Sequence, residues 1–144
     1  MEQASPSVNR QHAPYLGLPA KFSGIPNFMQ YRIGPGADLQ DAALSYADLR
    51  WSNFRGANLK GAKLCDSILW GSVMTKVDLT GADLRYADLT GVDLVGANLT
   101  DCKIEGACFL GARYGKSTRF PEGFGDPEEK GLISLDGSAP GLLE

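Results

Sequence analysis

The chain has 144 residues, a length typical of one domain, and 43% of them are hydrophobic while 22% are charged. These values exclude a wholly disordered or collagen-like chain. No apolar run reaches the roughly 18 residues that a transmembrane helix needs, so no membrane span is expected. A net charge of −3 is far from the strongly basic balance of nucleic-acid-binding proteins, so no nucleic-acid partner is expected either.

Residues 1–36 form the first segment and hold five of the eight prolines. Proline fixes φ and removes a backbone donor, so this segment is predicted to be extended rather than a long helix or a central strand. It is too rich in apolar side chains for a typical disordered tail. We therefore expect it to pack against this chain or a partner, through residues that include Tyr15, Phe22, Phe28 and Tyr31. No secretion signal is recognised at its start.

Residues 37–116 repeat every five residues, from ADLQD to ARYGK, in 16 unbroken pentapeptides. The central residue is large and apolar in every repeat, and the residue two positions before it is small. Glycine ends 8 of the 16 repeats. An internal repeat of this kind determines the fold and must be recognised before any other pattern.

A five-residue period fits neither an amphipathic helix nor a simple half-buried strand. It places two side chains on the inner face of a short extended segment, because residues i and i+2 of a strand share a face. The final glycine then suits a corner with positive φ. Four such sides predict a square coil of 20 residues, with successive coils stacked about 4.8 Å apart and leucines filling the interior.

The A-(D/N)-L-x-x pattern resembles the pentapeptide repeat family, whose fold is an all-β, right-handed quadrilateral β-helix. The resemblance implies about four coils in residues 37–116, with residues 117–144 as a C-terminal cap and acidic tail. The run from Thr118 to Pro127 is similar to the segment after the last repeat in many cyanobacterial members, although Gly125 is inserted here. It suggests a photosynthetic or thylakoid-associated host assembly.

Both ends of a solenoid expose an open core and unpaired edges. Phe120, Pro121 and Phe124 are the expected plug at the C-terminal end. At the other end, the expected plug consists of Phe28, Met29, Tyr31 and Ile33.

An enzyme is not expected, because the residues that could do chemistry do not converge. Four aspartates occupy equivalent positions in one coil and point in four directions: Asp78, Asp83, Asp88 and Asp93. Aspartate and asparagine at these positions are predicted to bind nearby backbone N–H groups. The chain has few residues that could ligate a metal: one histidine, His12, and three cysteines without a CxxC pair. No metal site or cofactor is therefore expected. Cys102 occupies an alanine position, and unpaired cysteines favour a reducing, cytoplasmic location.

The outward positions of the third side depart from the polar pattern. Six apolar or aromatic residues belong to this side and its corners: Tyr46, Trp51, Ile68, Trp70, Tyr86 and Leu110. Exposed apolar patches commonly mark binding surfaces, and Trp and Tyr are favoured interface anchors. Two alternatives remain open: the termini of this chain cover the side, or the side is simply exposed.

These features predict a non-enzymatic protein–protein interaction module that docks on a larger complex through the third side and residues 1–36. The alternative is a regulatory inhibitor of an enzyme such as a topoisomerase, because some members of the family are thought to imitate DNA. That role needs a long acidic rod. Residues 37–116 hold nine Lys and Arg against ten Asp and Glu, which disfavours it.

Overall fold

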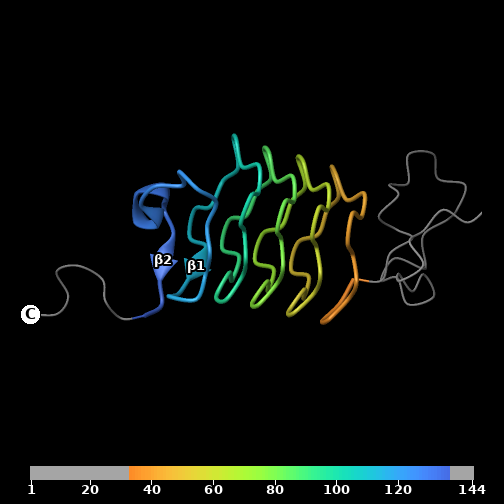
Figure 1. The fold of residues 1–144 in the computed structure, drawn as a ribbon, viewed down its shortest axis with the longest axis horizontal. Helices are drawn as coiled ribbons and strands as arrows, with labels where there is room; N and C mark the ends of the chain where they lie inside the picture. The colour runs from red at the N-terminus through yellow and green to blue at the C-terminus, as the bar shows by residue number, and fades with distance from the viewer. Residues whose placement is uncertain (1–32, 137–144) are drawn as a thin grey trace, which may run out of the picture.

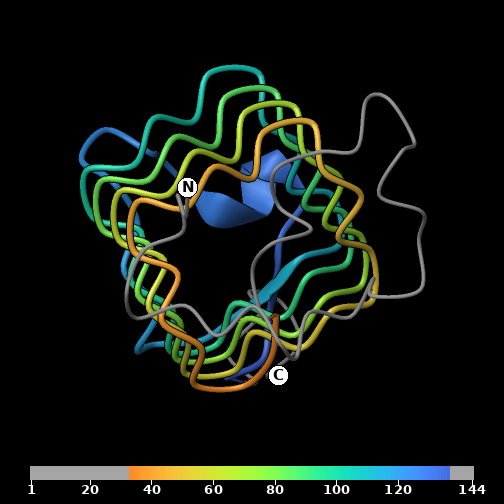
Figure 2. The same cartoon turned by 90° about the vertical axis from the view of Figure 1, so that its right-hand side faces the viewer.

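The computed structural model describes residues 33–136, which wind into a stack of similar coils (Figure 1). Figure 2 looks along the stack and shows the four-sided outline of each coil. The square coil predicted from the five-residue repeat and the right-handed quadrilateral β-helix implied by the family resemblance are confirmed. The predicted contacts of Tyr15, Phe22, Phe28, Met29 and Tyr31 lie outside the described residues.

Successive coils pair in parallel with a register of 20 residues. Asp38 pairs with Asn58, which in turn pairs with Asp78, and the other three sides repeat this relationship. The Leu39 N–H donates to the Asn58 carbonyl at 2.7 Å, and the Asn58 N–H donates to the Ala37 carbonyl at 2.9 Å. Each side is so short that most of the pairing consists of single-residue parallel bridges.

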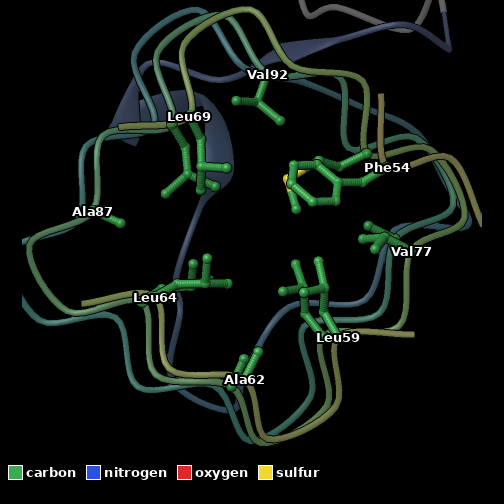
Figure 3. Close-up of a cluster of buried hydrophobic side chains, with 14 of the residues drawn as sticks. Phe54, Leu59, Ala62, Leu64, Leu69, Val77, Ala87 and Val92 are labelled. Atoms are coloured by element: carbon green, nitrogen blue, oxygen red, sulfur yellow. The ribbon is translucent and has the colours of Figure 1, made fainter. Parts of the chain in front are cut away.

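The central residues of the repeats fill the inside of the tube. Figure 3 shows Phe54, Leu59, Leu64 and Leu69 converging from four consecutive sides of the tube, and all four are fully buried. The smaller residues between them, such as Ala62 and Ala87, lie closer to the wall. Each large buried side chain contributes roughly 1.5–3 kcal/mol before chain entropy is subtracted, so the core is the main source of stability.

Every corner from Asp41 to Gly111 has a left-handed backbone. Over these corners, the fifth residue of the repeat has φ between 60° and 76°, whether or not it is glycine. Glycine adopts this conformation without steric cost, which explains its frequency at the fifth position. Non-glycine residues hold the same conformation at other corners, among them Tyr46, Trp51 and Tyr86.

The coil continues beyond the repeats, although its register slips by one residue. Asn98 pairs with Arg119, 21 residues on, and the Thr118 hydroxyl bridges the extra residue by donating to the Leu94 carbonyl at 2.9 Å. On the fourth side, strand β1 (Arg113–Tyr114) pairs in parallel with β2 (Ile133–Ser134) in the 20-residue register. Part of a further coil therefore lies on top of the last full one.

The segment between these two pairings plugs the open core, as predicted. Phe124 stacks on Phe120 at 4.4 Å and meets Phe109 edge-on at 5.4 Å between ring centroids. Pro121 is buried beside them, and the 3-10 helix η3 (Pro127–Lys130) follows, seen through the coils in Figure 2. At the other end, Ile33 packs partly buried against the core. No helix within residues 33–136 is long and apolar enough to cross a bilayer.

Candidate protein-interaction face

The third side of the solenoid consists of residues 47–51 and their equivalents at 67–71, 87–91 and 107–111. We call this side, with the corner residues Tyr46 and Tyr86 that precede it, the third face. All six residues predicted from the sequence to lie on it are exposed: Tyr46, Trp51, Ile68, Trp70, Tyr86 and Leu110. Tyr46 and Trp51 are the most exposed, at 74% and 75% of their surface.

The rings of Trp51 and Tyr86 each lie against a glycine of the following coil. A Cβ added at Gly71 would collide with the Trp51 ring, and one added at Gly106 would collide with the Tyr86 ring. The two rings therefore rest directly on backbone. Their positions depend on the absence of a side chain 20 residues further along the sequence.

Trp70 is held in place from two sides. Its indole N–H donates to the Asp88 carboxylate at 2.6 Å, and the Arg50 guanidinium lies over its ring at 5.5 Å from the centroid. Arg50 in turn forms a 2.7 Å ion pair with Asp48. The ring is thus fixed by a chain of polar contacts that runs across three successive coils.

Asp88 is the polar centre of this chain. Burial alone would raise its pKa, but hydrogen bonds from Thr90 and Trp70 outweigh that effect and hold the pKa below its usual range. The Asp48 carboxyl also has a lowered pKa, chiefly because the Arg50 side chain donates hydrogen bonds to it. Both groups are therefore carboxylates at neutral pH.

Sequence reasoning missed this network. It treated Asp88 as a turn residue and Trp70 as one member of an exposed apolar group. A signal was available, because the 20-residue register sets Asp88 diagonally opposite Trp70 on the adjacent coil.

The six exposed residues do not form one unbroken apolar surface. Trp51, Ile68 and Trp70 cluster on the first two coils, where the Trp51 N–H also donates to the Trp70 carbonyl at 2.9 Å. Leu110 lies two coils beyond Trp70, and Thr90 occupies the equivalent position between them. The third face thus consists of an aromatic cluster, a polar strip and a second apolar area near the C-terminal end.

The aspartates and asparagines that precede the central residues on all four sides accept hydrogen bonds from nearby backbone N–H groups, as predicted. Each accepts a hydrogen bond from the N–H two residues on, as Asp78 does from Thr80 at 3.0 Å. The Arg85 side chain also donates to Asp83 and lowers the pKa of that carboxyl to about 2. No group of three His, Cys, Asp or Glu residues in the described part of the chain could hold a metal ion.

The three cysteines are free thiols. Cys102 is buried at an alanine position, and its sulfur lies 3.0 Å from the Leu79 carbonyl oxygen. Burial raises the pKa of its thiol to about 12, so the group stays protonated and behaves as a small apolar residue.

The repeat and its geometry match known proteins. The family model described as pentapeptide repeats (8 copies) matches residues 36–71 and 72–113. The chain is 37% identical to alr5209, a pentapeptide repeat protein from Nostoc PCC 7120, over 69% of this chain and 82% of that one, with a TM-score of 0.68.

A second solved structure is AT2G44920, a pentapeptide repeat protein from the Arabidopsis thaliana thylakoid lumen. It is 33% identical over 57% of this chain and 61% of its own, with a TM-score of 0.47. No curated protein matches the chain. The family match spans more than half of the sequence and agrees with the coil geometry, so this chain belongs to the pentapeptide repeat family.

Proposed function

We propose that this protein is a non-enzymatic interaction module that docks on a larger protein complex through the third face. The observation that carries the proposal is the presence of exposed aromatic residues at corners with a left-handed backbone. Trp51 has a φ of 61°, and Tyr46 and Tyr86 have φ values of 63° and 62°.

These residues occupy positions where glycine is the stable choice. A left-handed conformation costs an L-residue roughly 1–2 kcal/mol, and it is least expected for a bulky side chain. Gly91 and Gly111 occupy the Trp51 corner in later coils, so the fold itself has no need of an aromatic residue there. The strain is not offset by burial, because three quarters of the Trp51 surface is exposed. Strain of this kind is typical of functional positions.

The aromatic cluster is also rigid before any partner binds. Contacts with Arg50 and Asp88 fix Trp70, and the Trp51 ring rests on Gly71. A side chain that is already ordered loses little entropy on binding, so such residues make effective interface anchors.

The partner that we propose is a protein of a cyanobacterial photosynthetic or thylakoid-associated assembly, contacted also by Tyr15, Phe22, Phe28 and Tyr31. Similarity to a Nostoc protein and the TxFPxGF run after the repeats support this host. Free cysteines support a reducing, cytoplasmic location.

Inhibition of an enzyme such as a topoisomerase is less well supported. DNA mimicry needs a continuous acidic surface, whereas Asp48, Asp83 and Asp93 each form an ion pair with an arginine. We propose no enzymatic activity for the chain itself, because the four aspartates of the third coil, Asp78, Asp83, Asp88 and Asp93, lie on four different sides.

The test compares two substitutions at corners with the same backbone. Trp51→Gly removes the most exposed ring of the third face, and Asp101→Gly removes a side chain from another corner with a φ of 63°. Tagged chains are used to isolate complexes from native extract. Trp51→Gly should lose a defined partner that wild type and Asp101→Gly both retain. Retention of every partner by a folded Trp51→Gly variant would overturn the proposal.

A further inference from the structure

The last full coil is only half covered. After Phe120 the chain leaves the wall of the tube and crosses the core through Phe124. It rejoins the wall at Gly131, whose carbonyl accepts the Gly111 N–H at 2.8 Å. Within the described residues 33–136, the second and third sides of this coil, residues 102–110, therefore have no further coil on top of them, in contrast to the fourth side, where β2 pairs with β1.

This difference leaves a row of backbone groups that have no partner in the part of the chain that the structure describes. In the preceding coil, the Leu84 and Leu89 N–H groups donate to the Lys103 and Cys108 carbonyls at 2.8 and 2.7 Å. The corresponding donors of the last coil are Ile104 and Phe109, together with Gly106 at the corner. Within residues 33–136 none of the three donates a backbone hydrogen bond, and the Cys102 and Ala107 carbonyls accept none. They form an open edge that can accept a strand.

A hollow of about 620 Å³ lies along the same edge. Sites of this size accommodate a small ligand or a short peptide segment. Its wall is mainly apolar, and its two charged residues have opposite signs. The lining residues are Ile104, Glu105, Gly106, Ala107, Cys108, Phe109, Leu110 and Lys130.

We propose that an uncharged segment of the partner protein continues the coil over this edge, extended along the second and third sides and turning at the corner above Gly106, and places one apolar side chain in the hollow. A main chain that repeats the path of the coil beneath it supplies carbonyl and N–H groups at the spacing of the edge, and glycine is favoured at its corner because Gly106 has a φ of 74° there. Glu105 and Lys130 balance each other, which favours a segment without net charge. Cys108 and Leu110 belong to both the hollow and the third face, so one partner can occupy both. The identity of the strand's source thus rests on the proposed function.

The test uses the full chain labelled with ¹⁵N and two probe peptides. The first probe is a capped Ala-Thr-Val-Thr-Gly-Ala-Thr-Val-Thr peptide, whose glycine allows the turn at the corner. The second has the same sequence with N-methyl groups on alternate amides, which remove its donors. At millimolar concentration the first peptide should shift the amide signals of Ile104, Gly106 and Phe109 and slow their hydrogen exchange. The second should do neither. Absence of any difference between the two peptides would overturn the proposal.

A pair of variants tests whether the peptide occupies the hollow. Ala107→Gln places a longer side chain in it and should abolish the peptide-induced shifts, whereas Lys103→Gln on the outer wall of the same coil should leave them unchanged. If Ala107→Gln does not fold, the comparison of the two peptides on wild type still decides the question.

Hydrogen exchange of the chain without peptide gives a further check that can overturn the proposal. Slow exchange of the three edge amides without peptide would mean that the edge is already filled. If the slow exchange disappears when residues 137–144 are deleted, the occupant is this chain's own tail. If the slow exchange depends on protein concentration, the occupant is a second copy of this chain. The proposed function is tested separately, because Trp51→Gly leaves the open edge intact.

Discussion

The indole N–H of Trp70 donates a 2.6 Å hydrogen bond to a carboxylate oxygen of Asp88, a residue 18 positions further along the sequence. The bond joins two adjacent coils on the outer surface, whereas most other contacts between coils are made by backbone or core. It turns an exposed aromatic residue into a fixed feature of the third face.

Replacing Asp88 should therefore release Trp70. Asp88→Ala removes the acceptor, so the indole ¹H–¹⁵N signal of Trp70 should move towards the position of a solvent-exposed indole. Loss of a hydrogen bond to a charged group should cost about 1.5–3 kcal/mol at most, and less at this partly exposed site. The matched control is Asp78→Ala, since Asp78 makes the same hydrogen bonds with Thr80 but has no tryptophan beside it. An unchanged Trp70 signal in Asp88→Ala would show that Arg50 alone orders the ring.

Alanine substitutions at Gly71 and Gly81 separate the energetic effect of the Trp51 ring's contact with Gly71 from the effect of backbone strain. Both have left-handed φ values, 62° and 72°, so alanine at either site should cost roughly 1 kcal/mol. Gly81→Ala meets no atom within 4 Å, whereas Gly71→Ala must displace the Trp51 ring. Urea unfolding should thus show the greater loss for Gly71→Ala. Equal losses would mean that the Trp51 ring moves away at no cost.

Trp51→Gly should make the chain more stable while weakening its interactions. Relief of the left-handed strain should raise the free energy of unfolding by about 1 kcal/mol, reduced by the loss of the ring's contact with Gly71. Thermal unfolding of this variant beside wild type measures the net effect. A lower melting temperature would show that the ring stabilises the fold, and it would remove the argument that strain at this corner serves binding.

Stability should depend on the charge of Asp83 at acid pH. The pKa of this carboxyl is about 2 in the folded chain, against an ordinary value of 3.8. A lowered folded pKa means that the carboxylate stabilises the fold above the unfolded pKa and loses this contribution as the pH falls towards 2. The stability difference between wild type and Asp83→Asn should shrink over that interval in urea titrations. Asp78→Asn serves as the control, and a constant difference for Asp83→Asn would contradict the prediction.

Cys102 should resist alkylation, whereas Cys108 should react. Burial holds the Cys102 thiol protonated, with a pKa of about 12, and Cys108 is exposed. Mass spectrometry of the native chain after brief treatment with iodoacetamide reads out both sites. Cys102→Ala should change the free energy of unfolding by less than about 1 kcal/mol, because alanine fills the same slot at Ala42, Ala62 and Ala82. Rapid labelling of Cys102 would show that the coil opens locally.

The tube itself could be predicted from the repeat. A period of five residues with one large and one small apolar residue determines what faces inward, and stacking by translation puts each residue next to its equivalent 20 positions away. The same rule puts the four aspartates of one coil, including Asp78 and Asp93, on different sides, as the structure has them. The plug of Phe120 and Phe124 followed from the need to cover an open core.

The candidate site was predicted less completely, because it depends on departures from the repeat. The 20-residue register shows that Trp51 and Trp70 share a face, but not that Trp70 bonds to Asp88 or that Trp51 lies over Gly71. Those contacts depend on side-chain rotamers, which no periodic pattern specifies.

The sequence by itself determined the periodic part of this protein: the leucine-filled tube, its corners and its register, since each repeat meets the same neighbours. Only the tertiary structure decided what happens where the repetition ends. The path of residues 121–130 across the core, rather than along the wall, depends on how Phe124 packs against Phe109 and Phe120. That packing closes the core and leaves the edge at Ile104 to Leu110 open, because one segment cannot fill the centre and pair with the wall at the same time.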